Sequence, residues 1–330
     1  MNKRAVGILG TGSYMPERIV TNKDLEKTME TSDEWIVSRT GIGARRVAAP
    51  EEATSDLAAE AGRRALLDAN VNAEELDLII VATVSPDMAF PSTACLVQAQ
   101  LGAKRAAAFD ISVACSGFIY GMSIAQQFIQ TGLYQKVLVV GAETLSRFIS
   151  WDDRKTGMLF GDGAGAAVLG ETAEGFGILG LDMGADGSGA ELLKIPAGGS
   201  REPASLASVK ERGHIIHMDG SEVFKFAVKV MGESALRALE AAGLTTADLA
   251  LLVPHQANIR IIQSAVKRLG MTMDKIMVNV DRYGNTSAAS IPIALDEAAK
   301  QGRFKTGDTI GLCGFGAGLT WGSAIIKWSR

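Results

Sequence analysis

Residues 65–81 read ALLDANVNAEELDLIIV, and residues 238–254 read ALEAAGLTTADLALLVP. A shift of 173 residues places the first stretch on the second, so that Ala65 falls on Ala238 and Leu78 on Leu251. Each stretch reads as the end of a helix, a turn, an acidic residue and a buried strand. Because the same succession occurs twice, we expect a chain built from two similar halves.

The similarity extends outward from these stretches. With nearly the same shift, residues 137–141 (VLVVG) fall on residues 310–314 (IGLCG). Short β-branched runs alternate with Ala-rich segments of helical period, which is typical of an α/β protein with buried sheets. We expect the halves to be residues 1–170 and 171–330, packed so that equivalent strand ends converge on one site.

The composition excludes several classes of protein. Of 330 residues, 47% are hydrophobic and 21% charged, and only 8 are Pro, which indicates a compact globular protein rather than a disordered or fibrous one. The formal net charge of -4 gives no overall basic field that would attract nucleic acid or an anionic membrane. The aliphatic runs have strand length and fall short of the roughly 20 residues of a membrane span. An anionic partner would therefore need a local basic patch.

Cysteine usage indicates a reducing compartment. The three cysteines, at positions 95, 115 and 313, are too few and too far apart for a disulfide framework or a CxxC metal site. The first residues, MNKRAVGILGTG, contain too short an apolar stretch for a signal peptide. We therefore expect a cytoplasmic protein.

Cys115 is the candidate nucleophile. It lies between a predicted buried strand over 106–112 and a helical pattern over 116–131, which places it at a helix N-terminus. There the helix dipole and unpaired N–H groups favour thiolate over thiol. Cys95 and Cys313 lie in apolar surroundings, and we expect them to be buried and structural.

His255 is the candidate partner among three histidines. His214 and His217 have no carboxylate or thiolate near them in sequence, so we expect no metal site there. His255 follows the predicted buried strand over 249–253 and opens a predicted helix, and the carboxyl end of a strand is where ligands bind in α/β sheets. Taken alone, it could equally be a structural histidine.

Asn285 is the third candidate. It lies in YGNTS, between a predicted strand over 277–280 and a predicted helix over 288–301. Gly-Asn is also ordinary turn chemistry. The internal repeat, however, places Asn285 near the position that corresponds to Cys115, so that the Cys, His and Asn side chains could face one another.

Two further patterns bear on binding. The single GxGxxG, over 175–180, reads as a strand rather than a strand-turn-helix, which argues against a dinucleotide. The turn GFGAG over 314–318 follows a buried strand and could bring backbone N–H groups close to a substrate oxygen. Basic residues recur at helical spacing and suit a phosphate-bearing carrier, although solvated charges are the default interpretation: Arg260, Lys267 and Arg268, with Lys225 and Lys229 as a second pair.

Cys115 in VACSGF, His255 in HQANIR and Asn285 in GNTSAA together resemble β-ketoacyl-acyl carrier protein synthase III. The resemblance runs nearly end to end, through residues 22–43 and 160–169 and the Gly-rich turn before 320–323. It implies a thiolase-like fold of two duplicated halves in a layered αβαβα arrangement, which agrees with the repeat.

The resemblance also implies a reaction. Cys115 would attack a short acyl-coenzyme A to give an acyl-enzyme. Malonyl-acyl carrier protein would then lose CO2 while His255 and Asn285 donate hydrogen bonds to its thioester oxygen. The N–H groups of Cys115 and Ala317 would hold the oxyanion, and Phe315 would border the decarboxylation site. Ala317 replaces a glycine of the family's usual turn, which matters if that position needs a positive φ. No cofactor or metal is implied.

Binding residues follow from the same resemblance. Those for coenzyme A are Thr31, Trp35, Arg39, Arg154 and Asn258, with the adenine between Trp35 and Arg154. Those for the acidic carrier protein are Gln256, Ala257, Asn258, Ile259, Arg260, Lys225, Lys267 and Arg268. Phe90 would reach across a homodimer to close the acyl pocket.

Other functions stay open on sequence grounds. Chain-elongating synthases of this fold use two histidines, whereas this chain offers Asn285 at the second place. Plant-type polyketide synthases differ around Trp35 and in the C-terminal turn. A synthase III-like enzyme of secondary metabolism is the nearest alternative, followed by a non-condensing protein that binds acyl carriers and by a thioester hydrolase. The acyl primer is not predicted.

Overall fold

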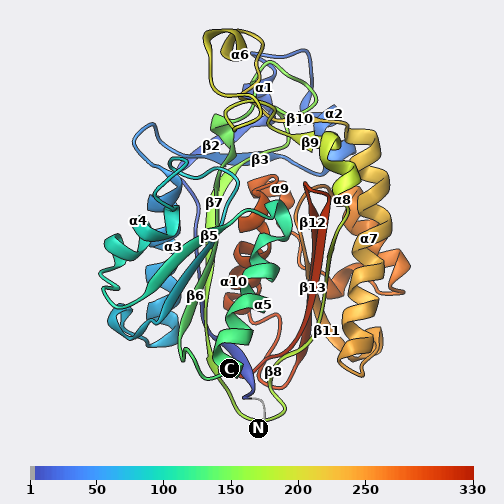
Figure 1. The fold of residues 1–330 in the computed structure, drawn as a ribbon. Helices are drawn as coiled ribbons and strands as arrows, with labels where there is room; N and C mark the ends of the chain where they lie inside the picture. Colours follow the sequence, from blue (N-terminus) through green and yellow to red (C-terminus); the bar gives the residue numbers. More distant parts are fainter. Residues whose placement is uncertain (1–3) are drawn as a thin grey trace.

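The computed structural model describes residues 4–330, so the first three residues of the stretch considered for a signal peptide lie outside the described part. Two main sheets face each other across a pair of buried helices, and further helices cover the outer face of each sheet (Figure 1). The predicted α/β class and the layered αβαβα arrangement are therefore confirmed. Within residues 4–330, no helix is both long and apolar enough to cross a membrane.

The first sheet has the strand order β1-β7-β6-β4-β5. β4 pairs in parallel with both β5 and β6, while β7 runs antiparallel to β1 and β6. β5 was predicted as a buried strand, but it lies at an open edge and its side chains are only half-buried. The strands are β1 Val6–Tyr14, β4 Leu78–Ala82, β5 Ala107–Ile111, β6 Val137–Thr144 and β7 Asp162–Glu171.

The second sheet repeats this pattern in the order β11-β12-β13-β8. β11 and β12 are parallel, as β4 and β6 are, and the other two strands are antiparallel to their neighbours. The strands are β8 Gly177–Ala185, β11 Leu249–Pro254, β12 Thr309–Gly316 and β13 Thr320–Lys327.

The strand predicted over 277–280 is wrong. The structure has one isolated bridge there, from Leu252 to Ile276, and a short helix, α9 Val280–Tyr283, begins where the strand was expected to end. The Gln256 side chain explains the difference: its amide nitrogen donates to Met277 O and its amide oxygen accepts from Asn279 N. A side chain thus takes the backbone groups that a strand partner would otherwise use.

Two helices form the central layer. α5 Gly117–Gln130 belongs to the first half and α10 Ser290–Lys300 to the second, and both pack into one apolar core with strands of both sheets. A 3-10 turn precedes each helix, η2 Ala114–Ser116 and η7 Ser287–Ala289. The outer layers are α3 Thr54–Ala69 with α4 Thr93–Leu101, and α7 Gly220–Ala241 with α8 Ile259–Arg268.

α8 begins three residues later than the helix predicted to open at Gln256. Asn258 is in an extended conformation and its side chain accepts a hydrogen bond from Arg260 N, so it is the N-cap of α8. The remaining short elements gather at one end of the layers, at the top of Figure 1: β2 Arg18–Thr21, α1 Asn22–Leu25, α2 Asp33–Thr40, β3 Ala44–Val47, β9 Leu193–Lys194, α6 Leu206–Lys210 and β10 His217–Met218.

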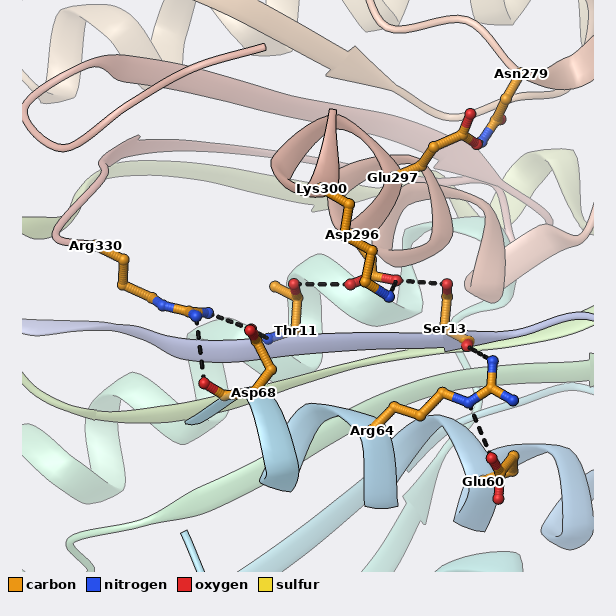
Figure 2. A network of polar contacts seen from close by, with 10 residues as sticks. All are labelled: Thr11, Ser13, Glu60, Arg64, Asp68, Asn279, Asp296, Glu297, Lys300 and Arg330. Carbon is orange, nitrogen blue, oxygen red and sulfur yellow. Dashed lines mark hydrogen bonds and ion pairs between the residues drawn. The ribbon is translucent and has the colours of Figure 1, made fainter. Parts of the chain in front are cut away.

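A buried carboxylate joins the two halves. Asp296 of α10 accepts hydrogen bonds from Thr11 Oγ1 at 2.9 Å and Ser13 Oγ at 2.5 Å, both on β1 (Figure 2). Lys300 Nζ lies 2.8 Å from the same carboxylate. The backbone of Thr11 also donates to Asp68 of α3. The outer strand of the first sheet is thus fastened to a helix of the second half.

Candidate active site

Cys115 lies in η2, directly before α5, so its predicted position at a helix N-terminus is confirmed. Its side chain is 6% exposed and lines a cavity of about 220 Å³ with Ala317, Ser287 and a set of mainly apolar residues. The thiol Sγ lies 3.4 Å from Ser287 Oγ. A reactive group on a mainly apolar cavity suits the binding of an acyl chain.

Burial controls the proton of this thiol. The pKa of Cys115 is raised to about 12, mainly because the thiol is removed from water; the nearby Glu143 carboxyl also raises it, and the contact with Ser287 lowers it. Burial therefore opposes the thiolate that the position at a helix N-terminus was expected to favour.

His255 lies at the carboxyl end of β11, as predicted, and is 1% exposed. Its backbone N–H donates to Cys313 O at 2.8 Å, and its Nδ1 lies 2.6 Å from Ser290 Oγ. Burial lowers the pKa of His255 to about 3, so the imidazole is neutral at physiological pH. A neutral imidazole with one occupied nitrogen can donate a hydrogen bond from the other.

β12 brings the histidine and the cysteine together. A methyl group at Gly314 would lie 3.4 Å from Cys115 O and 3.5 Å from His255 Cβ, so the strand runs between the two residues. Phe315 packs edge-on against His255, with ring centroids 5.5 Å apart. Phe315 thus borders His255.

Asn285 is held on three sides. Its N–H donates to Leu159 O at 2.8 Å, its carbonyl accepts from Gly161 N at 3.0 Å, and its side-chain Oδ1 accepts from Ser287 N at 2.8 Å. Because Oδ1 is occupied by a backbone donor, the Nδ2 group is the part of the amide that can serve a ligand.

Two nitrogens of the site, His255 Nε2 and Asn285 Nδ2, make no hydrogen bond within residues 4–330. Both are therefore free to serve a ligand, although neither residue lines the Cys115 cavity itself.

The turn after β12 places Ala317 beside Cys115. Ala317 has no positive φ, whereas the next residue, Gly318, has a φ of 136°. The replacement of a glycine by Ala317 therefore costs no backbone strain. Gly316 approaches so closely that a methyl group on it would lie 2.6 Å from Cys115 N.

Sequence reasoning missed three residues around this centre. Ser287 touches the thiol, Ser290 touches His255, and Glu143 is a fully buried carboxyl that accepts hydrogen bonds from Ser85 Oγ and Val84 N. Burial raises the pKa of Glu143 to about 7. A charged residue in the apolar run VLVVGAET was a visible signal for Glu143, whereas nothing in the sequence distinguishes the two serines from other helix-initiating residues.

The residues expected to bind coenzyme A lie in or beside the short elements that gather at one end of the layers. Arg154 rests on the Trp35 ring with Cζ 3.9 Å from its centroid, and Arg39 lies 4.9 Å from the same centroid. Asn258 Nδ2 donates to Arg39 O. Trp35 and Arg154 line a cavity of about 1090 Å³. Because Arg154 already covers the indole, an adenine ring between the two needs Arg154 to move.

The residues expected to meet the carrier protein divide into two groups. Gln256 is 1% exposed and bonded to Pro254 O and Met277 O, so its prediction as a contact residue is wrong: it fastens the strand end. Ala257 and Ile259 are half-buried, and Ile259 packs against Gly41. The charged members are exposed: Lys225, Arg260, Lys267 and Arg268.

Other predicted features fall away from this centre. Phe90 is 85% exposed on the loop that follows β4. Cys313 is buried as expected, whereas the expected burial of Cys95 is wrong, because that side chain is exposed on α4. Among residues 4–330, no group of three or more His, Cys, Asp or Glu side chains could hold a metal ion.

Comparison with known proteins identifies the family. Residues 109–187 match the family described as 3-oxoacyl-[acyl-carrier-protein] synthase III, and residues 239–328 match its C-terminal part. The chain is 64% identical to a β-ketoacyl-[acyl-carrier-protein] synthase III of Caldanaerobacter subterraneus, over 99% of both chains. This chain belongs to the synthase III family. The suspected resemblance is thereby confirmed, and Cys115, His255 and Asn285 all lie within the matched segments.

Solved structures of the synthase III family have the same fold. The 3-oxoacyl-[acyl-carrier-protein] synthase III of Aquifex aeolicus is 49% identical, with a TM-score of 0.91 over 98% of this chain and 100% of that one. The priming β-ketosynthase of the R1128 polyketide biosynthetic pathway is 38% identical, with a TM-score of 0.93 over 99% and 97%. The chain is therefore similar in structure both to a synthase III and to a priming ketosynthase of a polyketide pathway.

Proposed function

We propose that this chain is a β-ketoacyl-acyl carrier protein synthase III that condenses a short acyl-coenzyme A primer with malonyl-acyl carrier protein and so initiates fatty acid synthesis. The observation that carries the proposal is the thiol of Cys115 at the start of a buried helix, on a mainly apolar cavity, with the side chains of His255 and Asn285 bonded to Ser290 and Ser287. Membership of the synthase III family supports the same reaction.

In the first half-reaction Cys115 attacks the thioester carbonyl of the primer. The thiol proton leaves as the S–C bond forms, and the coenzyme A thiolate departs and is protonated. The N–H groups of Cys115 and Ala317 stabilise the oxyanion, since both lie at the cavity. One such donor contributes about 3 kcal/mol to transition-state stabilisation.

In the second half-reaction the malonyl group loses CO2. Electrons from the broken C–C bond move toward the thioester oxygen, where negative charge develops. His255 and Asn285 lower that barrier by donating from Nε2 and Nδ2, which make no hydrogen bond within residues 4–330. The carbanion then attacks the acyl group, and the Cys115 thiolate leaves.

The substrates would enter at the end of the layers where the short elements gather. Thr31 Oγ1 is buried without a partner, which supports a ligand hydrogen bond there. Trp35, Arg39, Arg154 and Asn258 would hold the nucleotide and pantetheine of coenzyme A. For the carrier protein, Arg260 and Lys267 pair with no carboxylate within residues 4–330, whereas Lys225 and Arg268 pair with Glu222 and Glu233. The free cations are the better contacts for an acidic partner.

A homodimer is supported by two exposed features. β5 is an open edge strand whose Phe109 and Ile111 side chains are only partly buried, and such edges pair with other strands. Phe90 is largely exposed, as expected of a residue that enters a partner's acyl pocket.

The free thiols of Cys95, Cys115 and Cys313 support a cytoplasmic location. The reaction as proposed needs no metal or cofactor.

A two-step labelling experiment tests the proposal. The protein is incubated with a panel of acyl-coenzyme A primers, the adduct is located by peptide mass spectrometry, and malonyl-acyl carrier protein is then added. Acylation of Cys115 followed by discharge as a ketoacyl product is expected. Cys115→Ala should abolish the adduct, while Cys95→Ser, on the exposed thiol, should leave it intact. No adduct, or an adduct that only hydrolyses, would overturn the assignment in favour of a carrier-binding protein or a thioester hydrolase.

A priming synthase of secondary metabolism is the second candidate. The observation that favours it is the likeness to the R1128 priming β-ketosynthase. The same primer panel separates the two, because loading by acetyl or short branched primers with discharge by the fatty-acid carrier protein supports the first function. Discharge only by a polyketide carrier protein supports the second.

A further inference from the structure

Ser290 makes the shortest contact to His255. Its Oγ lies 2.6 Å from His255 Nδ1, and both side chains are buried. Ser290 is the first residue of α10, so the helix that lies in the central layer also carries this hydroxyl. No carboxylate contacts the imidazole within residues 4–330, and the other close neighbour is the ring of Phe315.

The surroundings of Ser290 favour one direction of this hydrogen bond. The backbone N–H of Gln256 donates to Ser290 Oγ at 3.4 Å. Among residues 4–330, His255 Nδ1 is the one acceptor within reach of the Ser290 hydroxyl. If the oxygen accepted from Nδ1 as well, the buried hydroxyl would have no partner for its own proton, so donation from the hydroxyl to Nδ1 is favoured. A neutral imidazole that accepts at Nδ1 carries its proton on Nε2.

We infer that Ser290 is a positioning residue that sets the tautomer of His255, keeping the proton on Nε2 so that the histidine donates a hydrogen bond to the substrate. This rests on the proposed function, in which Nε2 faces the thioester oxygen where charge develops. A carboxylate in place of Ser290 would hold a proton on Nδ1 and leave Nε2 as a base. The choice of a hydroxyl thus decides whether His255 acts as a donor or as a base.

The tautomer can be observed directly. The chain has three histidines, so a long-range ¹H–¹⁵N spectrum of protein labelled at histidine resolves each ring. We expect His255 of the unmodified protein at neutral pH to show a protonated Nε2 and an unprotonated Nδ1. Ser290→Ala should shift the Nδ1 and Nε2 signals toward a mixture of tautomers. A proton on Nδ1 in the unmodified protein would refute the inference, even if every variant failed to fold.

Kinetics tests the consequence. In Ser290→Ala we expect kcat for condensation to fall about 10- to 100-fold, where the upper value corresponds to the loss of one oxyanion donor. KM for malonyl-acyl carrier protein should be nearly unchanged. Ser290→Thr keeps the hydroxyl and should restore both the tautomer and kcat. The matched control is Ser234→Ala, because Ser234 is another buried helix serine whose hydroxyl bonds only Ser323, and it should leave kcat and the His255 spectrum unchanged.

The outcomes separate this inference from the proposed function. Full kcat in Ser290→Ala with an unchanged His255 spectrum would refute the positioning role alone. A protein that shows the expected tautomer but forms no ketoacyl product with any primer would refute the proposed function and, with it, the donor role of Nε2.

Discussion

The close approach of β12 to the nucleophile predicts a large effect of one methyl group. In Gly316→Ala the new Cβ would lie 2.6 Å from Cys115 N, 3.1 Å from Ala114 Cβ and 3.2 Å from Cys115 Cβ. An unstrained contact needs about 3.5 Å, so η2 and β12 must separate by about 0.9 Å. The methyl group would also cover the Cys115 N–H that the proposed reaction uses as an oxyanion donor.

Both consequences reduce the acylation rate. A misplacement of about 1 Å at a reacting group can cost roughly 100-fold, and the loss of one oxyanion donor costs about 100- to 1000-fold. We therefore expect Gly316→Ala to slow acylation of Cys115 at least 100-fold. Overpacking should also lower the free energy of unfolding by about 1–3 kcal/mol, which still leaves a folded protein.

The assay is the rate of mass increase on Cys115 after mixing with acyl-coenzyme A, with thermal unfolding measured in parallel. Gly187→Ala is the matched control, because a methyl group there meets nothing within 4 Å and should change neither quantity. Acylation of Gly316→Ala at the unmodified rate would refute the argument that strand and nucleophile are in contact at this point.

Three further predictions concern buried charges. Asp296→Ala leaves two buried hydroxyls without an acceptor and should lower the free energy of unfolding in urea by about 2–5 kcal/mol. Lys300→Met, at the exposed partner, should lower it by less than about 1 kcal/mol. Equal losses in the two variants would contradict the role given to the carboxylate. The folded-state pKa of His255, about 3, lies below the ordinary value of 6.5, so the unfolded chain binds a proton at higher pH than the folded one. The free energy of unfolding should therefore fall as the pH drops from 6.5 toward 3, by up to about 1.4 kcal/mol per pH unit. The His255→Gln variant should show a flatter slope. The folded-state pKa of Glu143, about 7, lies above the ordinary 4.5, so stability should instead fall as pH rises from 4.5 to 7, and a Glu143→Gln variant that keeps this slope would disprove the assignment.

Much of the fold could be predicted from the sequence, because buried parallel strands appear in it as apolar runs. The pairs β4 and β11, and β6 and β12, occupy the positions that the internal repeat predicted. The strand over 277–280 was mispredicted because the Gln256 side chain, rather than a neighbouring strand, bonds the backbone of Met277 and Asn279. A contact between residues so far apart in sequence leaves no periodic pattern. The open edge at β5 was also invisible, since an apolar strand reads alike whether a neighbour covers it or not.

The site was predicted less completely. Local pattern marked Cys115, His255 and Asn285 as lying close to element ends, but the internal repeat and the family resemblance were needed to choose His255 and Asn285. The pKa of the Cys115 thiol depends on burial by several elements at once, which the position at a helix N-terminus does not reveal. Ser287 and Ser290 contribute one hydroxyl each at distances that only the packed structure supplies.

The shared central layer bears on how such a chain could arise. Each sheet rests one face on α5 and α10 together, and β1 of the first half is bonded to Asp296 of the second. A single half would expose the inner face of its sheet and one whole side of its helix to water. A chain of one half would therefore have to pair with a second copy to keep these apolar faces out of water.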